Sequence, residues 1–324
     1  MNKRWLTAKC CALAGLATLW MATPLASWAA GGVQKMSLAV DGMPRVYALL
    51  VPEGATAPMP LVIVFHGQGG DATNAIERGD WAHKAQASGF AVVAPQGSAE
   101  HEDRRTSLLV NARSWNAGEM SGSSAQVRGV DDVGFIRALI DELLRNPRLD
   151  PSRVYATGMS NGAGMTFRVG LELSDRIAAI APVANGLLTA PQPLLQPVSL
   201  LMIWGTADPL NPIAGGSVKR AGGSVQRPSG LDSWQAWSRL LHCPGEPAVE
   251  LPANGVTLRA QRGCDGGATA HFITIDGMGH QWPGGQVYAR VLAGPGSNAL
   301  NATDEIWKFF SSLKPRPPGS RSTR

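Results

Sequence analysis

Residues 154–165, VYATGMSNGAGM, join a strand pattern to Gly-x-Ser-x-Gly and then to a helix pattern. This order is typical of a nucleophile elbow, a tight strand-to-helix turn that exposes a serine hydroxyl at the top of a sheet. The turn brings backbone segments close together, so small residues are needed around Ser160, and Gly158, Gly162 and Ala163 meet that need. Because glycine and serine are common in loops, the hypothesis also requires an acid, a base and an oxyanion site elsewhere in the chain.

Continuous apolar runs, typical of parallel strands that are covered on both faces, recur along the chain. They lie at residues 61–65, 90–94, 153–156, 177–181, 198–204 and 271–275. Two further strands, at 36–40 and 45–51, are joined by an Asp-Gly hairpin signal. Helical patterns separate most of the runs, and the clearest starts near Asp131, a candidate N-cap. This alternation predicts an α/β fold with a mostly parallel central sheet and helices on both faces.

Three long segments have no regular pattern, and each follows a predicted strand. They are rich in Gly, Ser or Pro and lie at residues 97–130, 208–230 and 283–299. Loops at the carboxyl ends of parallel strands are where α/β proteins build ligand sites. We expect these segments to shape a ligand groove, with solvated surface loops as the alternative.

Residues 1–29 have the pattern of a cleaved export signal. A basic start at Lys3 precedes an apolar run at residues 10–22 and a small-x-small site at Ser27-Trp28-Ala29. The run is interrupted at Pro24 and falls short of the ~20 residues that a membrane span needs, which disfavours an anchor. We therefore expect a secreted or periplasmic protein with no stable membrane association after cleavage.

The remainder of the chain is predicted to be one domain, residues 30–313, followed by a flexible basic tail at 314–324. No internal repeat or second composition divides it. The net charge of +5 comes from the chain ends, because seven basic and no acidic residues lie in segments 1–30 and 314–324. Subtracting those seven charges leaves −2 for residues 31–313, so nucleic-acid binding has no support in the body of the protein.

Export also changes what the cysteines predict. Removal of Cys10 and Cys11 leaves Cys243 and Cys264 in an oxidising compartment. The two are not in Cys-x-x-Cys spacing, which argues against a zinc or redox site. We expect a disulfide between them.

A candidate base for Ser160 is His280. A serine hydroxyl is a weak nucleophile until an imidazole takes its proton and a carboxylate orients that imidazole. In elbow-containing hydrolases the three residues follow the order Ser, Asp or Glu, His. Of the histidines after Ser160, His242 ends a predicted helix and His271 lies within a predicted strand, whereas His280 lies in a glycine-rich loop after the last strand.

Asp208 is the favoured acid because it directly follows the predicted strand at 198–204. Gly205 and Pro209 mark a turn that would fix its carboxylate at the strand end. The competing aspartates occupy a helix end, a helix start, a loop away from any strand end and a position close in sequence to His280: Asp175, Asp232, Asp265 and Asp276.

An oxyanion site needs two aimed backbone donors. The N–H of Asn161, the residue after the candidate nucleophile, is one. The loop after an early strand supplies the other, and in HGQGG, residues 66–70, we assign it to the N–H of Gln68. His66 precedes Ser160 in the chain and is expected to brace this loop rather than act as the base.

Six blocks in register resemble the polyhydroxybutyrate-depolymerase and feruloyl-esterase family over residues 36–313. They are HGQGG, SWNAG, VDDVGF, GMSNG, GTADP and GHQWPGG, starting at residues 66, 114, 130, 158, 205 and 279. The resemblance implies an α/β-hydrolase fold and a secreted serine esterase with Ser160, Asp208 and His280 as its triad. It also implies that Trp282 borders the substrate groove, with Trp115 a weaker candidate that could equally be packing.

The chain departs from the family in two respects. Many relatives have cysteines where Gln68, Glu119 and Met120 stand here, so a disulfide bracing the oxyanion loop is absent. Dedicated polymer depolymerases often continue into a polymer-adsorbing domain, whereas this chain extends about eleven residues past the last predicted helix, to Arg324. This difference weakens the expectation of insoluble-polymer degradation.

The sequence thus predicts an esterase that needs no metal or cofactor and acts on hydroxyalkanoate oligomers or on feruloyl or acetyl esters. A peptidase or amidase on the same fold is one alternative, because triad geometry does not separate esters from amides. A binding protein that retains the scaffold without catalysis is the other. The acyl group, the alcohol and the oligomeric state are not determined by the sequence.

Overall fold

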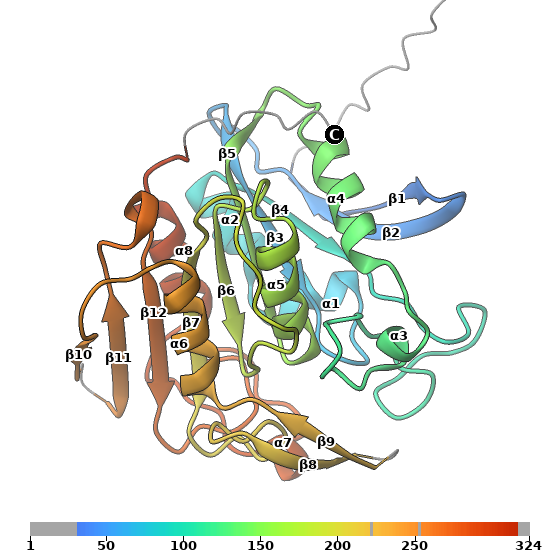
Figure 1. The fold of residues 1–324 in the computed structure, drawn as a ribbon. Coiled ribbons are helices and arrows are strands. Elements are labelled where there is room, and N and C mark those ends of the chain that lie inside the picture. Colours follow the sequence, from blue (N-terminus) through green and yellow to red (C-terminus); the bar gives the residue numbers. More distant parts are fainter. Residues whose placement is uncertain (1–30, 221–222, 252–253, 317–324) are drawn as a thin grey trace, which may run out of the picture.

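A ten-stranded sheet forms the centre of the computed structural model, which describes residues 31–220, 223–251 and 254–316 (Figure 1). The predicted export signal and most of the predicted tail lie outside these residues. The central strands are parallel, in the order β4 (Ala91–Pro95), β3 (Met59–Phe65), β5 (Leu149–Met159), β6 (Ala179–Val183), β7 (Ser199–Gly205) and β12 (Ala270–Ile275). Antiparallel strands complete the edges: β2 (Met43–Leu50) and β1 (Gln34–Val40) beside β4, and β11 (Val256–Gln261) and β10 (Ala248–Glu250) beside β12.

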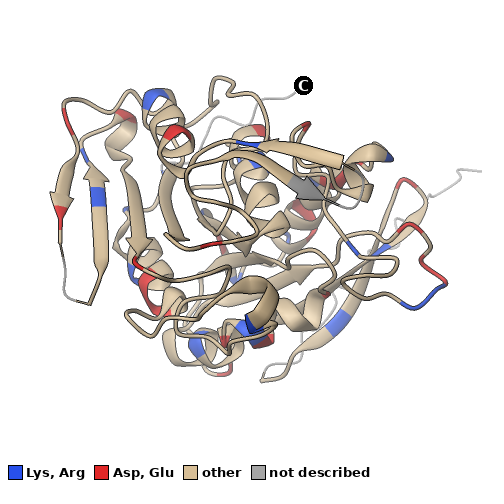
Figure 2. Ribbon diagram, turned by 90° about the horizontal axis from the view of Figure 1, so that it is seen from below, with Lys and Arg blue, Asp and Glu red and all other residues tan. Residues whose placement is uncertain are grey.

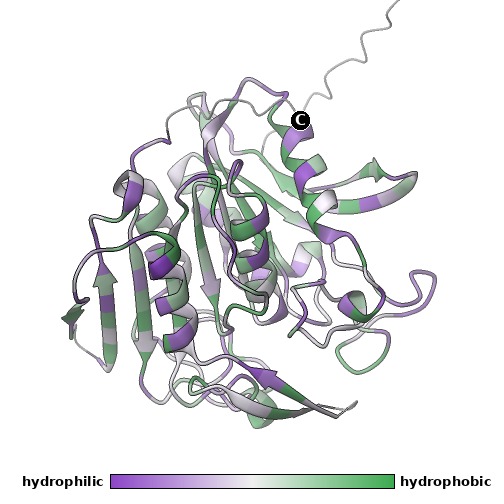
Figure 3. Ribbon diagram, viewed as in Figure 1, coloured by the Kyte–Doolittle hydropathy of each residue, from purple (hydrophilic) through white to green (hydrophobic). Residues whose placement is uncertain are grey.

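The central strands owe their position to their apolar sequences. Every residue of β3, β4, β6 and β7 is buried, as expected of strands covered on both faces. Figure 3 shows these hydrophobic strands at the centre of the molecule and hydrophilic residues on the outer sides of the helices. The predicted hairpin is confirmed, since Asp41 and Gly42 take positive φ angles of 50° and 78° between β1 and β2.

Helices cover both faces of the sheet, which confirms the predicted α/β architecture (Figure 1). One face carries α4 (Asp132–Leu143), α5 (Asn161–Glu172) and α6 (Gly230–Leu240). The other carries α1 (Ala72–Arg78), α2 (Trp81–Ser88) and α8 (Ala302–Ser312). The Asp131 side chain caps α4 as predicted, because its Oδ1 accepts the N–H of Gly134 at 2.8 Å.

The structure corrects the prediction in several segments. The segments without a regular pattern contain short elements, α3 (Ser124–Val127), the hairpin β8 (Gly216–Arg220) and β9 (Gly223–Arg227), and α7 (Arg290–Ala293). These elements, like β10 and β11, lack the apolar run that a buried strand or long helix shows. In Figure 1, β8, β9 and α7 gather below the carboxyl ends of the parallel strands, where a ligand site was expected.

Acidic and basic residues are interspersed on the side of the described fold that Figure 2 shows. Viewed onto the carboxyl ends of the strands, acidic and basic residues alternate around the molecule (Figure 2). No helix within the described ranges has the length and apolar character that a membrane crossing requires.

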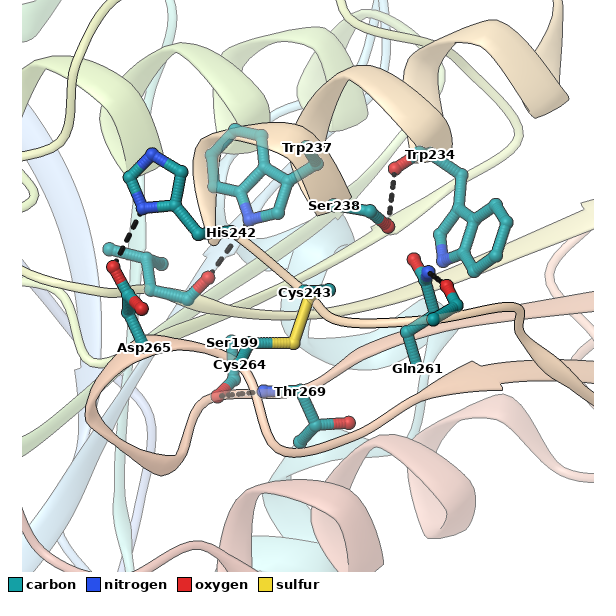
Figure 4. Close-up of a disulfide and its surroundings, with 12 residues drawn as sticks. Ser199, Trp234, Trp237, Ser238, His242, Cys243, Gln261, Cys264, Asp265 and Thr269 are labelled. Carbon is teal, nitrogen blue, oxygen red and sulfur yellow. Dashed lines mark hydrogen bonds and ion pairs between the residues drawn. A yellow bond between two sulfur atoms is a disulfide. The ribbon is translucent and has the colours of Figure 1, made fainter.

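The predicted disulfide between Cys243 and Cys264 is confirmed (Figure 4). It ties the segment after α6 to the segment between β11 and β12. Two further contacts support the junction: the Asp265 N–H donates to the Leu241 carbonyl at 3.0 Å, and the Asp265 carboxylate lies 2.7 Å from Nδ1 of His242. This junction anchors the antiparallel edge of the sheet to α6.

Replacing both cysteines, Cys243→Ser with Cys264→Ser, is expected to lower the free energy of unfolding. The bond closes a loop with a sequence separation of 21 residues, for which chain entropy predicts a loss of about 3 kcal/mol. Urea unfolding measures the change, and reduced wild-type protein is the matched control. A double variant as stable as the oxidised wild type would contradict this role of the disulfide.

Candidate active site

Ser160 lies at the sharp turn between β5 and α5, in a backbone conformation that few residues adopt. Its φ is 59° and its ψ is −121°. Such strain persists only where the surrounding structure enforces it. Here the Ser160 N–H donates to the Val183 carbonyl at 3.0 Å, and the Ser160 carbonyl accepts from the Asn185 side chain at 2.9 Å.

Glycine is required on both sides of this turn. A Cβ at Gly162 would lie 2.5 Å from the Phe65 carbonyl oxygen and 2.6 Å from that of His66. A Cβ at Gly158 would lie 2.8 Å from the same Phe65 oxygen. The end of β3 therefore packs directly against the elbow, which places the 66–70 loop beside Ser160.

The structure brings Asp208 and His280 into direct contact. Asp208 Oδ2 lies 2.7 Å from Nδ1 of His280, and the two side chains are 0% and 3% exposed. Three more donors hold the carboxylate: the N–H groups of Leu210 and Asn211, at 2.9 and 2.8 Å, and the Trp204 indole at 3.2 Å. A carboxylate in this position fixes the imidazole tautomer with Nδ1 protonated, which leaves Nε2 as a proton acceptor.

Ser160 and His280 both line one cavity of about 720 Å³ at the carboxyl ends of the strands. Within the described ranges the Ser160 hydroxyl has no hydrogen-bond partner that would hold it away from the imidazole. Catalytic hydrogen bonds often tighten only when substrate binds. Ser160 and His280 therefore border the same cavity, as the predicted roles require.

The two residues predicted to supply the oxyanion donors also line this cavity. Gln68 and Asn161 both line it, and Asn161 is the first residue of α5. Neither backbone N–H donates to a protein acceptor in the described part of the chain. Two such groups beside one serine are suited to binding a developing negative charge.

The Asn161 side chain has a structural role that the sequence did not reveal. Its Oδ1 accepts the Trp115 N–H at 2.6 Å, and its Nδ2 donates to the Trp115 carbonyl at 3.1 Å. Trp115 is 0% exposed, donates through its indole to the His66 carbonyl at 3.0 Å and is not part of the cavity wall. The expectation that Trp115 borders the substrate groove is therefore corrected: this residue packs beneath the oxyanion loop.

Trp282 lines the cavity but is firmly packed. It is 8% exposed, and its indole donates to the Thr303 hydroxyl at 3.1 Å, which in turn donates to the Gly79 carbonyl. Its ring also meets Trp81 edge to face at 6.2 Å. Trp282 thus forms a rigid section of the wall.

Asp132 is a second buried carboxylate to which the sequence assigned no role. It pairs with Arg45 at 2.6 Å and accepts the Asn116 N–H at 2.8 Å, so it anchors the 114–118 loop. Asp132 belongs to the VDDVGF block, which the sequence shows as one of the six blocks of the family resemblance. Only the fold reveals its partners Arg45 and Asn116. No cluster of three or more His, Cys, Asp or Glu side chains within the described ranges could hold a metal ion.

His66 is held neutral beneath the oxyanion loop. Burial lowers the pKa of His66 to about 4. Its Nδ1 donates to the Gly67 carbonyl at 2.7 Å, and its Nε2 accepts the Gly97 N–H at 2.9 Å. Both ring nitrogens are therefore engaged, which agrees with the expected bracing role and leaves neither nitrogen for general-base chemistry.

Acidification is expected to destabilise the fold through His66. The unfolded chain binds a proton near pH 6.5 and the folded chain only near pH 4, so this contribution is complete above 6.5 and is lost as pH falls toward 4. The loss is about 3 kcal/mol for such a shift. Urea unfolding at pH 7 and pH 4.5 should show a smaller pH effect in His66→Gln than in wild type.

The control for this measurement is His83→Gln, because the His83 side chain is 80% exposed. It should retain the wild-type difference between the two pH values. An equal pH effect in His66→Gln and wild type would show that His66 is not the group responsible.

Comparison with known proteins places the chain in one family. The family described as "Esterase PHB depolymerase" matches residues 45–190. "Putative esterase NocK" of Nocardia uniformis subsp. tsuyamanensis is 32% identical over 292 residues, with 84% of this chain and 80% of that protein covered. Feruloyl esterase B of Piromyces equi is 30% identical over 240 residues, and the match covers 71% of this chain and 41% of that longer protein.

The fold agrees with this assignment. The acetyl xylan esterase from Aspergillus awamori superimposes with a TM-score of 0.57 at 14% identity, over 87% of this chain and 99% of that one. At this identity the likeness concerns the fold alone, and it supports the α/β-hydrolase class predicted from the sequence. The chain is an esterase that belongs to the polyhydroxybutyrate-depolymerase family.

Proposed function

We propose that this esterase cleaves carboxylic esters through an acyl-enzyme formed on Ser160. The observation that carries the proposal is the buried Asp208–His280 pair, 2.7 Å apart, which shares a cavity with a serine on a strained elbow. Such a carboxylate stabilises the imidazolium that forms when His280 takes a proton.

The reaction follows from these positions. Ser160 Oγ attacks the ester carbonyl carbon while Nε2 of His280 removes the hydroxyl proton. The N–H groups of Asn161 and Gln68 bind the oxyanion of the tetrahedral intermediate. His280 then donates its proton to the departing alcohol, and the acyl group remains on Ser160. Water, activated by His280, attacks this acyl-enzyme and releases the acid.

The cavity supports small or oligomeric esters with apolar parts. Besides Trp282, leucines line it, including Leu108, Leu109, Leu188 and Leu292. Esters of short hydroxyalkanoate oligomers, or feruloyl and acetyl esters, have such apolar groups next to the reacting carbonyl. The relative named feruloyl esterase B and the family description favour the same substrate classes.

Peptidase or amidase activity is the alternative enzyme function. The proposed site has no feature that is specific to an amide leaving group, and family membership favours esters. A non-catalytic binding role is disfavoured by the complete set of nucleophile, base, acid and oxyanion donors. Parallel assays with an ester and the matching anilide would distinguish the two activities.

Export is the final part of the proposal. The signal pattern at residues 1–29 lies outside the described residues, but the Cys243–Cys264 disulfide supports an oxidising compartment. We therefore place the mature protein in the periplasm or outside the cell.

Ser160→Ala is expected to lower kcat for a nitrophenyl ester by about 10⁵-fold, because no other group would form the acyl-enzyme. A fluorophosphonate probe should label the wild type and fail to label this variant. Ser311→Ala is the matched control, since Ser311 is exposed on α8. Retained hydrolysis in Ser160→Ala would refute the assignment of the nucleophile.

Asp208→Asn should lower kcat by about 10³- to 10⁴-fold while KM changes little. The amide keeps the shape of the carboxylate but does not stabilise the imidazolium or the correct tautomer. Asp232→Asn, at the exposed start of α6, is the control for a competing aspartate and should behave as wild type. Steady-state kinetics on both variants decides between Asp208 and another acid.

A further inference from the structure

The charge of the active-site cavity differs from that of the fold as a whole. Two arginines, Arg78 and Arg227, line the cavity, and no aspartate or glutamate of the described residues does. Elsewhere acidic and basic residues alternate over the molecule (Figure 2). A cavity that is lined by positive charges only and has low-dielectric walls concentrates negatively charged ligands.

Arg78 is the last residue of α1, and it is oriented by an aromatic partner. Its guanidinium carbon lies 4.2 Å from the centroid of the Tyr288 ring, in a cation–π contact. Burial raises the pKa of Tyr288, and the charge of Arg78 opposes this shift. Arg78 thus lines the cavity that Ser160 and His280 also line.

Arg227 reaches the cavity from a different element, the strand β9. Its guanidinium donates to the carbonyl oxygens of Met120 and Ser121, at 2.8 and 3.1 Å. Ser121 also lines the cavity, and its hydroxyl accepts from the Asn161 side chain at 3.4 Å. Arg227 is thus fixed beside the residue that supplies a proposed oxyanion donor.

We propose that Arg78 and Arg227 bind a carboxylate carried by the substrate, so that the preferred esters are acidic ones. This inference rests on the proposed function and narrows it. Guanidinium groups bind carboxylates through paired, charge-assisted hydrogen bonds. Among the proposed substrate classes, a linear hydroxyalkanoate oligomer ends in a free carboxylate, whereas a polymer interior, a methyl ester and an acetylated sugar are neutral at that position.

The leucines of the wall suit the rest of such a molecule. The short alkyl branches of a hydroxyalkanoate unit would lie against Leu108, Leu188 or Leu292 while the terminal carboxylate reaches an arginine. The charged end would then fix the position of the ester bond relative to Ser160. Positioning of this kind raises kcat/KM for the acidic substrate without any change in the reacting groups.

The test compares two substrates that differ only in this charge: the linear hydroxybutyrate dimer acid and its methyl ester. Chromatography follows cleavage of the inner ester bond in both, and the readout is the ratio of their kcat/KM values. The wild type should prefer the acid. Arg78→Gln and Arg227→Gln should each lower the ratio by about 10- to 100-fold, the range expected for a charge-assisted hydrogen bond.

Two further variants separate binding from structure. Arg78→Lys should retain part of the preference, because an ammonium keeps the charge but loses the paired geometry. Arg290→Gln is the matched control, since Arg290 is exposed on nearby α7 and does not line the cavity; its ratio should equal that of wild type. Added salt should lower the wild-type ratio.

The outcomes separate this inference from the proposed function. A wild type that cleaves both dimers through Ser160 without preferring the acid overturns the inference alone. Arginine variants that lower both kcat/KM values equally also overturn it, because the residues would then only support the loops. Thermal unfolding identifies a variant that fails to fold, and if this happens with Arg227→Gln, the Arg78 variants decide. Dimer hydrolysis retained in Ser160→Ala would instead refute the proposed function.

Discussion

The close approach of Gly162 to the end of β3 is the constraint on which the candidate site depends. With the Phe65 and His66 carbonyl oxygens 2.5 and 2.6 Å from where a Cβ would stand, the elbow and the loop after β3 form a single packed unit. Ser160 is held at a positive φ by this packing. The same approach places Gln68 on the wall of the cavity that Ser160 also lines.

Neutral polar contacts then fix the oxyanion loop without a disulfide. His66 joins Gly67 to Gly97 through its two ring nitrogens, and Asn161 binds Trp115 through two hydrogen bonds. Burial favours the uncharged form of His66, so the ring bridges two backbone groups without an unpaired charge in the interior. These contacts hold the 66–70 loop against the elbow.

The sequence was most informative where local chemistry determines structure. Buried strands, the Asp41-Gly42 turn and the Asp131 cap follow from apolar runs and turn residues, and the structure confirms all three. The order of Ser160, Asp208 and His280 identified candidates, but the contact between Asp208 and His280 joins residues 72 positions apart, which only the folded chain brings together. For Trp115, composition allowed either packing or a groove position, and only the burial of the ring decides between them.

The β8–β9 hairpin and the residues of the cavity rim could not be predicted from the local sequence, and the reason is physical. These elements lack an apolar period, because they pack on loops and on one another rather than on the sheet. Their positions follow from single polar contacts, such as that of Arg227 with the Met120 carbonyl. Such contacts join segments far apart in sequence, and no spacing rule identifies them.

One rim segment contacts both Arg78 and the candidate base, His280. The His280 N–H donates to the Ala293 carbonyl at 2.6 Å, and the Gln281 side chain donates to the carbonyls of Tyr288 and Gly294. The loop that presents Tyr288 to Arg78 is therefore the loop that holds the backbone of His280. A ligand bound to Arg78 would therefore contact the same segment that holds His280, which provides a route by which the two could be coupled. If binding at Arg78 changes the placement of the imidazole, thermodynamic linkage requires that the placement of the imidazole change the affinity at Arg78 by the same factor.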